Sequence, residues 1–209
     1  MDLLRRSMCA LCVATALGAQ AQERSAVPDA REALAGAARS HALQRGGFTL
    51  YFRHTATDFT QNDTDMTGFE DCATQRNLNA QGRSDARAIG ESLRALKLAI
   101  SEVLASPYCR TLETARLMLN RASATRDVLG GMTTGGKPDY SALQKILATP
   151  PAPGTLRVIA SHGNPFHAIA GSPHLAEGEA AVVRGLGERW ILVARIRVED
   201  WPTLVSAAK

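Results

Sequence analysis

Arg53 and His54 follow directly after the apolar run FTLYF at residues 48–52. An apolar run of this length, rich in aromatic and β-branched residues, is typical of a buried strand. A guanidinium and an imidazole at the end of such a strand are costly to bury unless they meet an anion. Because open α/β sheets bind ligands at the carboxyl ends of their strands, Arg53 and His54 indicate an anion site with a candidate nucleophile.

Two further predicted strands lead to residues of the same kind. The strand predicted over 102–106 is followed closely by Arg110, and the strand over 157–161 runs straight into His162. In a parallel sheet these ends share one edge, so two arginines and two histidines are expected to converge. One guanidinium can donate hydrogen bonds to two phosphoryl oxygens at once. An imidazole that is hydrogen-bonded through one nitrogen can attack phosphorus with the other.

The segments that must position these residues alternate between strands and helices. Helices are predicted over 28–45, 81–98, 110–119, 142–148 and 166–170, strands over 48–53, 102–106 and 157–161, and a hairpin over 180–184 and 190–198. This alternation favours one three-layer α/β domain with a mainly parallel central sheet flanked by helices. The segments 55–79 and 120–142 show no period; long loops in compact domains are usually functional, so these two are predicted to set specificity.

Four segments also resemble a known family. They are LYFRHTATD (50–58), QRNLNAQGRSDARAIGESL (75–93), LASPYCRTLETARLM (104–118) and VIASHGN (158–164), and the likeness continues into EGEAAVVRGLG (177–187). Together they are similar to the histidine phosphatase superfamily, also called phosphoglycerate mutase-like, and within it to the small secreted bacterial members. The resemblance implies a phosphoglycerate mutase-like fold and hydrolysis of phosphomonoesters through a phosphohistidine intermediate.

The resemblance implies a role for each matching residue. His54 would be the nucleophile, and Arg53, Arg110 and a protonated His162 would form the phosphate pocket around it. Such a pocket acts mainly by positioning the phosphoryl group and stabilising its charge. No metal or other cofactor is expected, because no Asp, Glu and His cluster has metal-ligand spacing and the pocket histidines have other roles.

The chain departs from the family pattern at two positions. Thr55 stands where the family usually has glycine, and its hydroxyl is expected to contact phosphate. Asn164, also expected to contact substrate, cannot act as an acid just after the second histidine. The candidates for the proton donor to the leaving group are Asp58, Glu177 and Glu179. Glu177 is preferred because it lies in the stretch after the second histidine, although good leaving groups would need no acid.

The N-terminus has the pattern of a secretory signal. A short basic stretch, an apolar stretch over 8–19 and an A-x-A sequence at 19–21 predict a signal peptide over 1–21 and a histidine phosphatase domain over 22–209. The apolar stretch is too short to span a bilayer. We therefore expect a periplasmic or secreted protein with no membrane span after signal removal. A cytosolic protein with an apolar N-terminus is the alternative.

Cys9 and Cys12 lie within the predicted signal, which leaves Cys72 and Cys109 in the mature chain. An even pair in an oxidising compartment favours a disulfide. Closing a loop of roughly forty residues would stabilise the fold by about 4 kcal/mol on the loop-entropy estimate. Two independent buried thiols are the alternative.

The formal net charge of +4 comes without blocks of Lys and Arg or interleaved aromatics, so nothing supports nucleic-acid binding. A small positive excess suits a small phosphorylated substrate. By family analogy alone, an envelope location suggests a sugar phosphate, including the heptose phosphates of the lipopolysaccharide core.

Three other functions are kept beside phosphomonoester hydrolysis. A mutase would need a lid over its phosphoenzyme and a cytoplasmic substrate, and a short protein-phosphohistidine phosphatase is disfavoured by export. A non-catalytic phosphate-binding or envelope-interaction protein on the same fold is disfavoured by the complete set of Arg53, His54, Arg110 and His162. It is kept because no acid is obvious.

Overall fold

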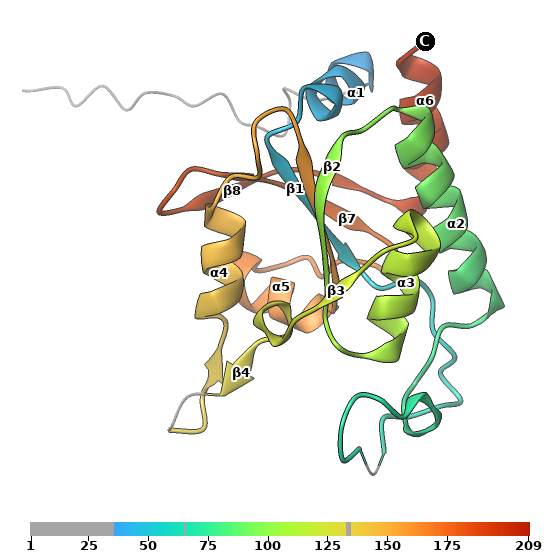
Figure 1. Ribbon diagram of the computed structural model, residues 1–209, viewed down its shortest axis with the longest axis vertical. Helices are drawn as coiled ribbons and strands as arrows, with labels where there is room; N and C mark the ends of the chain where they lie inside the picture. The colour runs from blue at the N-terminus through green and yellow to red at the C-terminus, as the bar shows by residue number, and fades with distance from the viewer. Residues whose placement is uncertain (1–35, 65, 133–134) are drawn as a thin grey trace, which may run out of the picture.

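The site is carried by a six-stranded sheet with helices on both faces (Figure 1). The computed structural model describes residues 36–64, 66–132 and 135–209. The predicted signal peptide, with Cys9 and Cys12, and the start of the helix predicted over 28–45 lie outside the described residues.

The strands run in the order β3-β2-β6-β1-β7-β8 across the sheet. Their bounds are β1 Phe48–Arg53, β2 Ile100–Ala105, β3 Ser123–Ala124, β6 Leu156–Ser161, β7 Ala180–Gly185 and β8 Trp190–Ile196. The neighbours from β3 to β1 pair in parallel, whereas β7 and β8 are antiparallel to their neighbours. The prediction of a mainly parallel sheet with a C-terminal hairpin is therefore confirmed. A separate small hairpin joins β4 (Gly131–Met132) to β5 (Pro138–Asp139).

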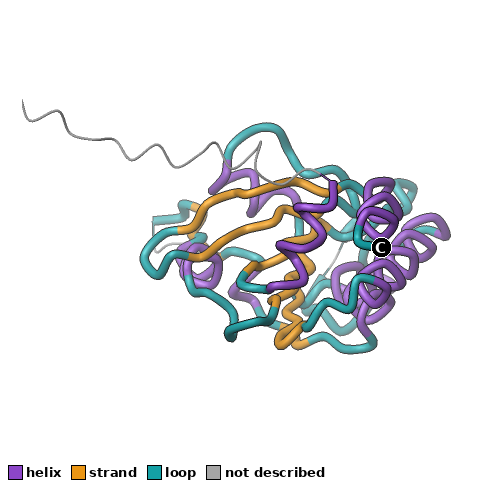
Figure 2. The backbone as a smooth tube through the Cα atoms, turned by 90° about the horizontal axis from the view of Figure 1, so that it is seen from above, coloured by secondary structure: helices purple, strands orange, loops and turns teal. Residues whose placement is uncertain are grey.

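The helices form the two outer layers (Figures 1 and 2). One face of the sheet carries α1 (Gly36–Arg45), α2 (Ala80–Ala95), α3 (Cys109–Leu119) and α6 (Trp201–Ala207), and the other carries α4 (Ser141–Ala148) and α5 (Gly163–Ala170). The described ranges also contain three short 3₁₀ turns: η1 (Cys72–Thr74), η2 (Arg126–Val128) and η3 (Val198–Asp200).

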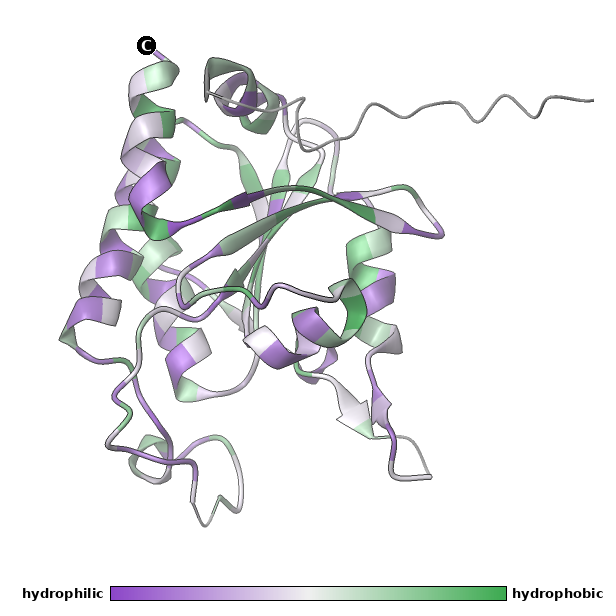
Figure 3. Cartoon of the chain, turned by 180° about the vertical axis from the view of Figure 1, so that it is seen from behind, coloured by the Kyte–Doolittle hydropathy of each residue, from purple (hydrophilic) through white to green (hydrophobic). Residues whose placement is uncertain are grey.

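The first five residues of β1 are buried because both faces of the strand are covered. Leu50 and Phe52 belong to the core beneath α2 and α3, whereas Tyr51, pointing the opposite way, belongs to the core beneath α4 and α5. In Figure 3, which is coloured by hydropathy, the hydrophobic residues (green) are concentrated in the strands. Hydrophilic residues (purple) lie along the outer side of α2. The two cores hold β1 rigidly, so its last residue is placed with little freedom.

Two features of the fold were not predicted. The helix α6 packs on the sheet through Trp201, whose ring stacks on Phe52 with centroids 6.0 Å apart. The Ser40 hydroxyl of α1 donates to the carbonyl oxygen of Leu204 at 2.8 Å. The two-residue strands β3, β4 and β5 lie in 120–142, where no pattern was visible.

No helix within the described ranges is long and apolar enough to cross a membrane.

Candidate active site

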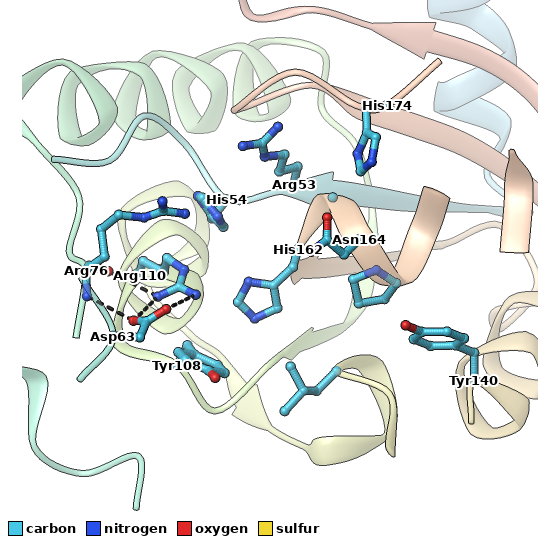
Figure 4. Close-up of a pocket in the computed structure, with 13 residues that line it drawn as sticks. Arg53, His54, Asp63, Arg76, Tyr108, Arg110, Tyr140, His162, Asn164 and His174 are labelled. Carbon is cyan, nitrogen blue, oxygen red and sulfur yellow. Dashed lines mark hydrogen bonds and ion pairs between the residues drawn. The ribbon is translucent and has the colours of Figure 1, made fainter. Parts of the chain in front are cut away.

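The predicted strand ends meet at one edge of the sheet. β1 and β6 are parallel neighbours in which Arg53 pairs with Ser161, so the residues that follow, His54 and His162, leave the sheet together. The main-chain amide of His54 donates to the carbonyl oxygen of Ser161 at 2.9 Å. β2, on the other side of β6, leads into α3, whose first turn carries Arg110. The two arginines and two histidines line one cavity of about 600 Å³ (Figure 4).

His54 is buried and neutral. Its Nδ1 lies 2.9 Å from the carbonyl oxygen of Thr55. Because a carbonyl can only accept, Nδ1 carries the hydrogen and Nε2 keeps its lone pair. Burial, followed by the charges of Arg110, Arg53 and Arg76, lowers the pKa of His54 to about 3, against the opposite effect of the Thr55 hydrogen bond. The side chain is therefore an imidazole with a nucleophilic Nε2 at neutral pH.

His162 lies beside His54, with the two ring centroids 5.6 Å apart. Its Nε2 is 2.8 Å from the Ser106 hydroxyl, and its carbonyl oxygen accepts a hydrogen bond of 2.8 Å from the Tyr51 hydroxyl. Burial, followed by the Arg110 charge, lowers the pKa of His162 well below its ordinary value. The expectation of a protonated His162 is therefore wrong for the free protein.

Arg110 forms an ion pair with the carboxylate of Asp63, a residue that was not predicted to belong to the site. Its Nη1 donates to Oδ1 of Asp63 at 2.8 Å, and its Nη2 donates to Oδ2 at 3.1 Å. The guanidinium also lies over the ring of Tyr108, 4.3 Å from the centroid. Burial raises the pKa of Asp63, but hydrogen bonds from Arg110 and from the Arg76 amide outweigh it and leave this pKa below its ordinary value. Asp63 is thus ionised and lines the cavity.

A third guanidinium, that of Arg76, faces the same space. Figure 4 shows this side chain pointing toward His54. Its Nε is buried and has no hydrogen-bond partner among the described residues. Arg76 and Asp63 both come from the segment 55–79, which the sequence analysis predicted to be functional without a pattern that could single out either residue.

Glu177, the preferred candidate for the proton donor, lies on the other side of His54. Its Oε1 accepts a hydrogen bond of 2.8 Å from the Thr57 hydroxyl and lies 3.5 Å from Nη2 of Arg53. The same oxygen is 3.9 Å from Nδ1 of His54, the nitrogen that already carries its hydrogen. Glu177 is not among the residues that line the cavity. Its position suits holding Arg53 and the chain after β1 rather than protonating a leaving group beyond Nε2.

Residues 50–131 match the family model described as the histidine phosphatase superfamily (branch 1), and this match includes Arg53, His54 and Arg110. This match agrees with the predicted resemblance over residues 50–131. His162 lies beyond the matched residues, and the fold brings it to them. No curated protein matches the sequence of this chain.

Two solved structures are similar to this chain in fold. The protein histidine phosphatase SixA complexed with tungstate has 19% identity and a TM-score of 0.50, covering 73% of this chain and 98% of its own. A mutant phosphoserine phosphatase from Entamoeba histolytica in complex with phosphoserine has 11% identity and a TM-score of 0.50, with the same coverage of 73% and 98%. At these identities the likeness concerns the fold, and the predicted phosphoglycerate mutase-like fold is confirmed.

The two other candidate acids serve structural roles. Oδ1 of Asp58 accepts hydrogen bonds from the Thr60 amide at 2.9 Å and the Thr60 hydroxyl at 2.7 Å, in an exposed turn. Glu179 forms a paired contact with Arg195, whose Nε and Nη2 donate at 2.7 and 2.8 Å. Neither carboxylate lines the cavity.

The two residues expected to contact substrate have different positions. Thr55 is fully buried, and its Oγ1 lies 3.3 Å from Oγ1 of Thr114 in α3. The prediction that the Thr55 hydroxyl contacts phosphate is therefore wrong, because this side chain packs between β1 and α3. Asn164 lines the cavity from the first turn of α5, where the sequence analysis expected it.

The end of the cavity away from Asp63 is less charged. Leu129 and Tyr140 reach it from the segment 120–142. His174, also missed in the sequence, lies on the same side in Figure 4, and its ring stacks on that of His167 with centroids 3.9 Å apart. The cavity therefore has an arginine-rich end that suits a phosphoryl group and an aromatic end that suits the rest of a substrate.

The predicted disulfide between Cys72 and Cys109 is confirmed, with Cα atoms 5.7 Å apart. Cys109 is the first residue of α3 and precedes Arg110, while Cys72 lies in the segment that carries Asp63 and Arg76. The bridge thus joins two parts of the arginine-rich end of the cavity. Across the described ranges, no group of three or more His, Cys, Asp or Glu could hold a metal ion.

Proposed function

We propose that this protein is a metal-independent phosphomonoesterase that forms a phosphohistidine at Nε2 of His54. The observation that carries the proposal is the state of His54, which is neutral and hydrogen-bonded through Nδ1 to Thr55 inside an arginine-lined cavity. This is the arrangement that a nucleophilic imidazole needs. The family match supports phosphoryl chemistry.

In the proposed reaction, the cavity stabilises charge on the transferring group. Arg53 and Arg110 lie on the two sides of His54 and can each hold phosphoryl oxygens, while His162 approaches from a third direction. Fixed guanidiniums aimed at the equatorial oxygens lower the barrier because they need no reorganisation during transfer. They supply the positive charge that a metal ion provides in other phosphatases.

We further propose a small phosphomonoester as substrate, with a sugar phosphate as the favoured class, and a periplasmic or secreted location. The cavity volume of about 600 Å³ and the polar and aromatic residues at its far end support a small substrate. The Cys72–Cys109 disulfide and the signal pattern in the sequence support export, since disulfides persist in oxidising compartments.

The test is phosphate release from 4-nitrophenyl phosphate and a panel of sugar phosphates, with trapping of an acid-labile phosphoenzyme and with EDTA present and omitted. We expect turnover unaffected by EDTA, and loss of both turnover and phosphoenzyme in His54→Asn. His41→Asn is the matched control, because His41 is an exposed histidine of α1. Wild-type protein with neither turnover nor phosphoenzyme would leave a non-catalytic phosphate-binding protein as the better description.

A further inference from the structure

The Asp63 carboxylate accepts the hydrogen bonds that Arg110 would otherwise donate to a phosphoryl group. Its two oxygens accept from both terminal nitrogens of Arg110, in the geometry that a phosphate would use. Asp63 is partly exposed, with 31% of its side chain accessible, whereas Arg110 is 6% accessible. Since the arginine is fixed and the carboxylate lies in a loop, substrate binding must displace Asp63 from Arg110. This step rests on the proposed phosphatase function.

The charges around the cavity determine what happens to the displaced carboxylate. Arg53, Arg76 and Arg110 provide three positive charges, and His54 and His162 are neutral. Glu177, beside Arg53, together with a phosphoryl dianion balances these three charges. A displaced Asp63 is then a surplus negative charge next to a dianion, which raises its pKa and favours uptake of a proton.

Asp63 is also in the right place to use that proton. In-line attack by Nε2 of His54 puts the leaving oxygen on the far side of phosphorus, inside the cavity. Among the described residues that line the cavity, Asp63 carries the one carboxyl group. Glu177 stands on the Nδ1 side of His54, behind the nucleophile.

We propose that, when substrate binds, Asp63 leaves its ion pair with Arg110 and becomes protonated, and that it is the general acid of the reaction. The lone pair of His54 Nε2 forms the N–P bond while the P–O bond to the leaving group breaks. The leaving oxygen keeps that electron pair and takes the proton from Asp63, so that an alcohol departs. In the second step a water oxygen bonds to phosphorus and gives its proton to Asp63, and the N–P electron pair returns to Nε2.

The experiment compares Asp63→Asn with wild type on 4-nitrophenyl phosphate, phenyl phosphate and an alkyl phosphate. An acid matters most for poor leaving groups, so we expect rates within a few-fold on the nitrophenyl ester and a loss of about 100-fold or more on the other two. Glu177→Gln should slow all three substrates in the same proportion. Asp71→Asn, an exposed carboxylate of the same loop, should match wild type.

Phosphate affinity gives a second readout. Removal of the competing charge should make inorganic phosphate bind Asp63→Asn at least as tightly as wild type, whereas a residue that merely positions Arg110 would weaken binding when changed. Equal losses on all three esters, or no loss on the alkyl ester, would overturn the role of Asp63. Absence of phosphoenzyme in wild type on the nitrophenyl ester would instead remove the proposed function itself. Thermal unfolding of each variant verifies the fold.

Discussion

The side-chain oxygen of Gln75 accepts a hydrogen bond from the main-chain amide of Cys109, with the two atoms 2.9 Å apart. Gln75 is buried, and this contact lies beside the bridge from Cys72 to Cys109. An α-helix leaves its first amides without partners inside the helix, so Gln75 satisfies one of them at the start of α3. The loop 55–79 is therefore joined to that helix by both a covalent bond and a buried hydrogen bond.

Loss of the disulfide should lower both stability and activity. In Cys72→Ser/Cys109→Ser, we expect the free energy of unfolding to fall by up to about 4 kcal/mol, because the open loop gains entropy in the unfolded chain. We also expect a lower kcat/KM, since Asp63 and Arg76 are held in place through this loop. Denaturant unfolding and steady-state kinetics measure the two effects. An unchanged kcat/KM would show that hydrogen bonds alone position the loop.

Arg110→Lys should weaken the binding of inorganic phosphate or vanadate by about tenfold or more. Lysine keeps the positive charge but cannot form the paired contact that a guanidinium makes with two oxygens. Inhibition constants against 4-nitrophenyl phosphate measure the change. Arg116→Lys is the control, because Arg116 lies on the same helix and is exposed. Equal inhibition constants for the two variants would contradict the assignment of Arg110 to the phosphoryl group.

Gly82→Ala should reduce activity although Gly82 lies outside the cavity. A Cβ at this position would overlap the main-chain oxygen and nitrogen of Ala56. Ala56 follows two residues after His54, so its displacement would move the imidazole, and a small shift of a nucleophile is costly. Gly131→Ala is the matched control, because a Cβ there meets nothing within 4 Å. A kcat for Gly82→Ala equal to that of Gly131→Ala would contradict the prediction.

The low pKa of His54 should be visible in the pH dependence of stability. The pKa is about 3 in the folded protein, below the value of about 6.5 for an unfolded histidine. The unfolded chain therefore binds more protons between these values, so stability falls as pH falls through this window. We expect the drop in unfolding free energy between about pH 7 and about pH 4.5 to be smaller in His54→Asn than in wild type. Denaturant titrations at both pH values measure it, and parallel curves for the two proteins would count against a neutral buried His54.

The sequence was sufficient to predict those helices and strands whose hydrophobic pattern extends over several residues. The strand predicted over 48–53 has the observed bounds, and the helices predicted over 81–98 and 110–119 agree within a few residues. The helix α6 was missed because it is short and depends on contacts of Trp201 with the sheet. Strands of two residues, such as β3, are too short to show a period.

The site was predictable where the sheet alone positions the side chain. His54 and His162 follow adjacent parallel strands, and Arg110 lies in the first turn of the helix after the next strand, so topology brings them together. Asp63 and Arg76 depend on the path of a long loop, which hydrogen bonds and a disulfide determine rather than any local preference.

The parallel pairing of β1 with β6 also has a consequence for the order in which the candidate site is assembled. Thr49 of β1 pairs with Arg157 of β6, and the two are 108 residues apart in the sequence. Contacts between such distant residues form slowly, because a long loop must close first. During synthesis the segment that carries His54 therefore emerges long before its partner strand exists. Until β6 enters the sheet, the nascent chain carries the imidazole of His54 without His162 beside it.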